Sequence, residues 1–179
     1  MPRKTGVMRE ARAAAGTAAF LTVAPGVVAG LVPWLLTGWE VEKPFPYWLP
    51  FRVVGASLLV AGLVTLLDAF ARFVKEGLGT PAPVAPTEHL VVGGLYRYVR
   101  NPMYLAVGSL IVGQTLLLGQ LILLPYAALF GLAVWSFVRW YEEPTLSRRF
   151  GAEYELYRRA VPGWWPRRTP WVSASARRH

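Results

Sequence analysis

The sequence predicts an all-α integral membrane protein: a helical bundle of about four transmembrane helices, with a C-terminal helical hairpin and a cytoplasmic amphipathic tail. Apolar residues make up 54% of the 179-residue chain and its mean hydropathy is +0.36, both high for a soluble domain of this length. Charged residues are also absent from three long intervals, 13–39, 53–67 and 101–138. Because crossing the hydrocarbon core takes about 20 helical residues, these intervals are the candidate spans.

The first interval predicts one spanning helix over residues 16–38. Pro25 and Pro33 are expected to kink this helix without excluding it. Basic residues before an apolar run are also typical of a signal peptide, but this run exceeds an ordinary signal-peptide apolar region. We therefore expect it to remain as the first span.

The second interval becomes a spanning helix over residues 49–72 if Arg52 and Arg72 extend their charges toward the membrane surfaces. The third interval is too long for one helix and about right for two short ones. Gly119 and Gln120 are the natural place for the chain to turn between them. The last two helices are therefore expected to form a tight hairpin.

The formal net charge of +9 is concentrated at the two ends of the chain and in the loop before the hairpin. By the positive-inside rule, both termini and this loop are predicted to be cytoplasmic, which agrees with an even number of spans. Attraction of basic residues to anionic lipid accounts for the rest of the excess positive charge. No nucleic-acid-binding module accompanies the arginines, so we expect no nucleic-acid partner.

The chain has no cysteine and only two histidines, His89 and His179. Disulfides, a thiolate nucleophile and cysteine-ligated metals are therefore excluded. We expect no metal site.

The most informative segment is GLYRYVRNPMY, residues 94–104, directly before the uncharged third interval. The Gly93-Gly94 pair predicts a close backbone approach or a positive φ. Pro102 is expected in the first turn of the third helix, with Asn101 as its cap. Free N–H groups at such a helix start can bind a carboxylate. The alternative is a capped membrane helix with Arg97 and Arg100 as ordinary anchors.

A second polar cluster, RWYEEP, follows the third interval at residues 139–144. Arg139 and Glu143 are four residues apart, which predicts that they share one helix face. Glutamates close to hydrocarbon tend to be paired or functional, so the alternative here is an interfacial salt bridge. Pro144 is expected to break or bend the helix, which would place Glu142 and Glu143 at its end.

Beyond this cluster, Phe150, Tyr154 and Tyr157 have helix-like spacing and arginines on either side. This pattern predicts an amphipathic element lying on the membrane, with packing inside the protein as the alternative. Near the inner end of the second helix, Asp68 is expected to pair with Arg72.

Taken in order, GLYRYVRNPMY, the uncharged hairpin and RWYEEPTLSRRFGAEYELYRRAVPGWWP resemble the isoprenylcysteine carboxyl methyltransferase and phospholipid methyltransferase group of membrane enzymes. The resemblance covers residues 79–166, about half of the chain. It implies an S-adenosylmethionine cofactor bound at the cytoplasmic face, between the motif before the hairpin and the paired glutamates. Together with the uncharged intervals and the basic end of the chain, it gives an expected division into two N-terminal spans (1–74), a cofactor-binding methyltransferase core (75–166) and a disordered basic tail (167–179).

The same resemblance implies the site residues. The cofactor-binding residues are Tyr96, Arg100, Asn101, Pro102, Tyr104, Glu142 and Glu143, and the catalytic residues near the substrate carboxylate are Arg139 and Glu143. The family motif often has histidine where this chain has Asn101. Asparagine can donate and accept hydrogen bonds but cannot act as a titrating base.

The implied reaction is methyl transfer to a lipid-like or isoprenoid acceptor that reaches the site from the bilayer. Carboxyl O-methylation is the reaction we expect most. A carboxylate is already anionic near pH 7, whereas the amine of phosphatidylethanolamine would need Glu142 or Glu143 to accept its proton. N-methylation of that phospholipid is the alternative. Other classes are an NADPH-dependent sterol-type membrane reductase and a non-catalytic membrane subunit. The oligomeric state stays open, since Gly55 and Gly62 could pack helices within one chain or between two.

Overall fold

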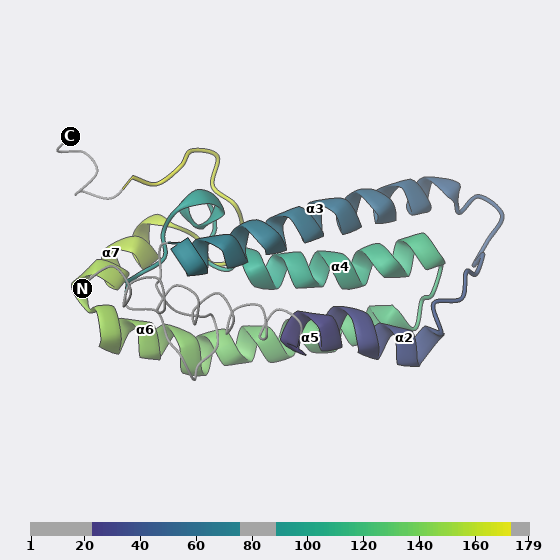
Figure 1. Cartoon of the computed structure of the whole chain (residues 1–179), viewed down its shortest axis with the longest axis horizontal. Helices are drawn as coiled ribbons and strands as arrows, with labels where there is room; N and C mark the ends of the chain where they lie inside the picture. Colours follow the sequence, from purple (N-terminus) through teal and green to yellow (C-terminus); the bar gives the residue numbers. More distant parts are fainter. Residues whose placement is uncertain (1–22, 76–88, 173–179) are drawn as a thin grey trace, which may run out of the picture. The chain divides into compact units, whose positions relative to one another are not determined.

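The computed structural model describes residues 23–75 and 89–172, and it contains helices and no strand within these residues (Figure 1). An all-α fold is therefore confirmed for the described part of the chain. The elements in chain order are η1 (Val27–Leu31), α2 (Val32–Thr37), α3 (Leu49–Lys75), η2 (Gly94–Arg97), α4 (Pro102–Leu118), α5 (Leu123–Phe137), η3 (Val138–Glu142), α6 (Glu143–Phe150) and α7 (Ala152–Ala160).

Two helical stretches, Leu49–Arg72 and Leu123–Phe150, are long and apolar enough to cross a membrane. Only 28% and 11% of their most apolar windows are buried inside the protein. A core helix of a soluble protein would bury most of such a window, so these side chains suit contact with lipid. The apolar helices Val23–Thr37 and Pro102–Leu118 are shorter, and the expected total of four spans remains a prediction.

The described residues form two compact units. One comprises residues 68–75, 89–102 and 136–172, and the other comprises 23–67 and 103–135. Each unit draws on both sides of the division predicted at residue 75. The predicted boundary at residue 75 separates parts with different proposed roles, not compact units, and it remains a prediction.

In the second unit, α3 and α4 pack closely through glycines (Figure 1). A Cβ at Gly55 would lie 2.7 Å from the carbonyl oxygen of Gly113, and one at Gly62 would lie 3.0 Å from that of Ala106. A side chain would clash with this backbone at Gly55 and would be tighter than an ordinary contact at Gly62. Both glycines named in the sequence therefore pack helices within the chain.

The helix that contains Pro33 continues through this residue, because a π-helical turn over Val27–Leu31 precedes it. Proline has no N–H, so carbonyl groups in the preceding turn lose a helical donor. Side chains of neighbouring helices supply donors: Gln114 Nε2 lies 2.7 Å from the carbonyl oxygen of Ala29, and the Tyr126 hydroxyl lies 2.7 Å from that of Val28. These bonds tie the first apolar helix to α4 and α5.

The turn between α4 and α5 occurs where the sequence predicts it. Gly119 has a φ of +76°, which favours glycine. A Cβ there would overlap the backbone of Glu42, in the connection between α2 and α3. Gln120 donates to the carbonyl of Glu40 in the same connection, so the turn and the connection support each other.

Candidate functional site

The site lies in the unit that contains residues 89–102 and 136–172, and it begins at the η2 turn. Gly94 has a φ of +49°, and a Cβ there would overlap the guanidinium of Arg72. The predicted positive φ is therefore confirmed at Gly94, whereas Gly93 is extended. Arg72 also pairs with Asp68 at 3.2 Å, as expected.

Arg100 is the centre of the site. Its Nη1 donates to Glu143 Oε1 at 2.6 Å and to the Tyr154 hydroxyl at 3.1 Å. Its Nε donates to the carbonyl oxygen of Val161 at 3.0 Å. The Arg100 and Glu143 side chains are each 15% exposed, so this is a largely desolvated, charge-assisted pair. The two motifs that the sequence singled out thus meet through one ion pair.

Glu143 has a second cationic neighbour. Its Oε2 lies 4.0 Å from Arg158 Nη1, on a side chain that is 41% exposed. Arg158 in turn pairs with Glu155 at 2.9 Å, and hydrogen bonds from Ser147 and Arg158 lower the pKa of the Glu155 carboxyl. These contacts continue the charged network from the site to α7.

Two tyrosines of α7 pack against the first motif. Tyr154 and Tyr157 are buried and form a cluster with Val161. The Tyr157 hydroxyl donates to the carbonyl of Tyr96 at 2.7 Å. Burial raises the pKa of both tyrosine hydroxyls, and the positive charge of Arg100 partly offsets this rise. Tyr154 and Tyr157 therefore pack inside the protein, which is the packing that the sequence also allowed, and the position of this element on the membrane remains a prediction.

The chain after α7 runs along the first motif. Backbone N–H groups of Arg100 and Asn101 donate to the carbonyls of Pro162 and Gly163, at 2.9 and 3.3 Å. Farther along, Arg167 N–H donates to Tyr98 and Trp171 N–H to Arg97, and the Arg97 side chain bonds back to the Trp171 carbonyl. Arg167 and Trp171, in the tail that the sequence predicts to be disordered (167–179), thus make backbone hydrogen bonds with the first motif. Residues 173–179 lie outside the described part, and the predicted disorder of the tail remains a prediction.

The sequence predicts that Pro144 breaks or bends the helix and places Glu142 and Glu143 at its end. The end is not there, because helical structure continues from Leu123 to Phe150. The π-helical turn Val138–Glu142 joins α5 to α6. Such a wider turn tolerates the missing N–H of a proline. The glutamates therefore lie inside a continuous helix.

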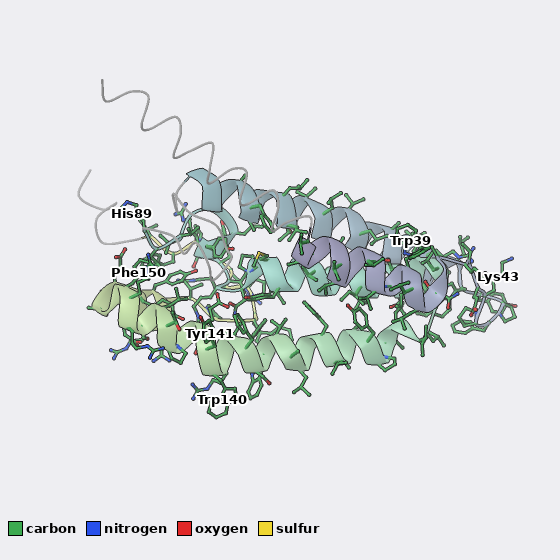
Figure 2. The ribbon with its side chains drawn as sticks, turned by 60° about the horizontal axis from the view of Figure 1, so that its bottom comes forward. Trp39, Lys43, His89, Trp140, Tyr141 and Phe150 are labelled. Atoms are coloured by element: carbon green, nitrogen blue, oxygen red, sulfur yellow. The ribbon has the colours of Figure 1, made fainter. Side chains whose placement is uncertain are left out.

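Among the described residues, Arg139 and Glu143 do not form the ion pair that their spacing would allow, and their shared face remains a prediction. Arg139 is exposed, and its guanidinium carbon lies 5.9 Å from the centroid of the Trp140 ring. Trp140 itself projects outward from the helix (Figure 2). Glu143 pairs with Arg100 instead.

The other predicted residues take the following positions. Tyr96 is in η2 and is buried. Pro102 is fully buried and begins α4, as expected. Glu142 is the last residue of η3. Tyr104 is in the first turn of α4 and belongs to the other unit. Tyr154 and Gly163 contact the site but were missed as site residues. Only the helical spacing of the tyrosines pointed to a buried role.

Asn101 tests whether the site suits S-adenosylmethionine. This side chain is 7% exposed, and its Nδ2 donor has no hydrogen-bond partner in the described part of the chain. A buried unsatisfied donor suggests an acceptor supplied from outside the protein. The carboxylate, ribose hydroxyls and adenine nitrogens of the cofactor are such acceptors, and the nearby glutamates could receive its ammonium or ribose hydroxyls. The residues present therefore fit this cofactor.

Comparison with known proteins agrees with the motifs. The model of a family described as phospholipid methyltransferase matches residues 51–153. A curated relative, protein-S-isoprenylcysteine O-methyltransferase of Schizosaccharomyces pombe, is 32% identical over 118 residues. This match covers 64% of the chain but 46% of the relative, so the chain spans about half the length of that protein. No solved structure matches the chain.

Proposed function

The chain belongs to the phospholipid methyltransferase family, and on this premise we propose that it is an S-adenosylmethionine-dependent methyltransferase acting on a membrane-embedded, lipid-like or isoprenoid acceptor. The observation that carries the proposal is the Arg100–Glu143 ion pair, which joins the two motifs next to Asn101, whose Nδ2 donor has no partner among residues 23–75 and 89–172. Four spans, cytoplasmic termini and a site at the cytoplasmic membrane face complete the proposal.

In this proposal, the cofactor is held by the residues of the first motif, with Glu142 and Glu143 opposite. The first-motif residues are Tyr96, Arg100, Asn101, Pro102 and Tyr104. The bound cofactor would supply an electrophilic methyl group. The protein would orient the acceptor in line with it and exclude water, which accounts for much of the catalysis in such transfers. The exposed guanidinium of Arg139 is the proposed partner of the acceptor carboxylate.

The surroundings of Glu143 favour carboxyl O-methylation over N-methylation. Its two oxygens face Arg100 and Arg158. Glu143 Oε1 already accepts a charge-assisted hydrogen bond from Arg100 at 2.6 Å, which favours an orienting role for this carboxylate. An amine acceptor needs a base, whereas a carboxylate acceptor does not. N-methylation of phosphatidylethanolamine is the second candidate, and the description of the matched family favours it.

The test is incubation of the purified protein, in detergent and in lipid, with S-adenosylmethionine labelled in its methyl group and total host lipid. We expect label in the lipid fraction, in a base-labile ester for O-methylation or a base-stable headgroup for N-methylation. Folded protein that transfers no label and is protected from thermal unfolding by NADPH but not by S-adenosylmethionine would instead be a reductase. Folded protein without either response would be a non-catalytic subunit.

A further inference from the structure

The segment after α7 contains a short loop, Gly163–Pro166, whose two ends are fixed. At its start, the carbonyl oxygens of Pro162 and Gly163 accept hydrogen bonds from backbone N–H groups of the first motif, at 2.9 and 3.3 Å. At its end, the Arg167 N–H donates to the carbonyl of Tyr98 at 3.0 Å. Because both ends are held by backbone hydrogen bonds, the loop keeps a defined place on the protein.

This loop presents an aromatic side chain outward. Trp165 is 83% exposed, and its indole N–H donates no hydrogen bond to any residue that the structure describes. Tryptophan favours sites where its ring is in an apolar environment and its N–H meets a polar one. An indole that a fixed backbone holds outside the protein therefore indicates a contact with something other than this chain.

The loop lies beside the start of an apolar helix. Gly163 pairs with Asn101, and the next residue, Pro102, begins α4. The 17 residues of α4 include no charged residue. At 1.5 Å per residue this helix is about 25 Å long, close to the roughly 30 Å of bilayer hydrocarbon. The proposed function makes α4 a span, which places the loop at the membrane surface, where tryptophan is enriched in membrane proteins.

The residues that follow the loop add positive charge to this surface. Arg168 is exposed and forms no ion pair within residues 23–75 and 89–172. The guanidinium of Arg167 instead lies against the protein, where its Nη1 donates to the carbonyl of Ala160 at 2.9 Å. Anionic lipid headgroups attract arginines close to the membrane surface. An indole with a guanidinium three residues later therefore matches an anionic bilayer surface, whereas a neutral apolar partner would leave Arg168 unpaired.

We propose that the Gly163–Pro166 loop and Arg168 form a membrane anchor. Trp165 enters the headgroup region of the leaflet beside the start of α4, and Arg168 binds the phosphate of an anionic lipid there. The inference rests on the proposed function only for the assignment of α4 as a span. Because the backbone of the loop pairs with the first motif, the anchor also fixes the depth of that motif in the membrane.

Spin labelling of the full 179-residue chain tests the anchor directly, because the chain has no native cysteine. Pro166→Cys places the label at an exposed position and keeps the indole of Trp165. The labelled protein is reconstituted in bilayers of phosphatidylcholine and phosphatidylglycerol. Collision rates of the label with oxygen, which enters the bilayer, and with a nickel chelate, which stays in water, give its depth. Phosphatidylcholines labelled in the headgroup or the upper acyl chain calibrate the scale.

We expect the label to collide more with oxygen than with the nickel chelate and to lie between the two calibrants. Trp165→Ala should move the label into water. Trp140→Ala removes another exposed indole, 75% exposed, and should leave the label in place. Thermal unfolding checks that each variant is folded. Greater access to the nickel chelate in folded protein with Trp165 present, or an equal change in the two variants, would overturn the anchor.

The lipid composition tests the part of the proposal that concerns Arg168. In Arg168→Gln, the fraction of phosphatidylglycerol that gives half of the change in depth should rise about fivefold, as expected for the loss of one arginine near an anionic surface. Arg159→Gln removes an exposed charge of α7 and should not shift this fraction. A depth that does not depend on phosphatidylglycerol would overturn the role of Arg168. A protein that transfers no methyl group but keeps its label in the membrane would contradict the proposed function and leave the anchor in place.

Discussion

Replacing Glu143 by glutamine tests whether the Arg100–Glu143 pair holds the two motifs together. Both side chains are 15% exposed and the bond is 2.6 Å long. Removing one partner of a fully buried ion pair costs about 3–5 kcal/mol, because the other charge stays buried without compensation. Here Arg100 keeps the Tyr154 hydroxyl and the Val161 carbonyl, and glutamine can still accept one hydrogen bond. We therefore expect a loss of about 2–3 kcal/mol in the free energy of unfolding.

The assay is equilibrium unfolding in mixed detergent micelles, followed by circular dichroism. Arg158→Gln is the matched control. Arg158 lies 4.0 Å from Glu143 on a side chain that is 41% exposed, so its contribution should stay within about 1 kcal/mol. The double variant Arg100→Gln/Glu143→Gln should lose much less than the sum of the single variants, since they share one interaction. A Glu143→Gln protein within about 0.5 kcal/mol of the wild type would refute the reasoning.

Three further predictions concern stability. Gly55→Ala should lower the free energy of unfolding by about 1–3 kcal/mol or more in the same detergent assay, because its Cβ would meet backbone atoms of α4. Gly30→Ala is the control and should not lower it, because a Cβ at Gly30 meets open space. Equal losses in the two variants would contradict the close helix contact. Tyr126→Phe should cost about 1–2 kcal/mol in that assay by leaving the Val28 carbonyl without its donor, and an unchanged stability would show that the bond is not formed. Burial raises the pKa of the Tyr157 hydroxyl, so the unfolded chain loses this proton at a lower pH than the folded protein does. The free energy of unfolding should therefore keep this contribution below a pH of about 10 and fall as the pH rises above it. Tyr157→Phe should reduce the fall when the free energy of unfolding is measured across this pH range, and an unchanged slope would contradict the assignment.

The features that the sequence predicted correctly are local. Pro102 begins α4 because proline suits a first helical turn, and Gly119 turns the chain because it adopts a positive φ. Asp68 and Arg72 pair because four residues of α-helix bring them together. Each of these depends on a few consecutive residues, so a single sequence contains the necessary information.

The features that the sequence did not predict depend on distant packing or on an altered helical period. A π-helical turn lets the helix continue past Pro144, and Glu143 pairs with Arg100 while Arg139 stays exposed beside Trp140. The spacing of Tyr154 and Tyr157 showed that one face is apolar but not whether lipid or protein covers it. The contact of Glu143 with Arg100 spans 43 residues, and no local pattern specifies that pairing.

The central claim is that the segment around Arg100 and Asn101 and the paired glutamates bind S-adenosylmethionine. Calorimetric titration of the purified, folded protein with this cofactor and with S-adenosylhomocysteine tests the claim most directly, in the wild type and in Glu142→Gln/Glu143→Gln. We predict saturable binding by the wild type and a loss of at least tenfold in affinity in the folded double variant, as expected when charged partners are removed. Absence of binding by the wild type in both detergent and lipid, or equal affinity in the double variant, would contradict the claim.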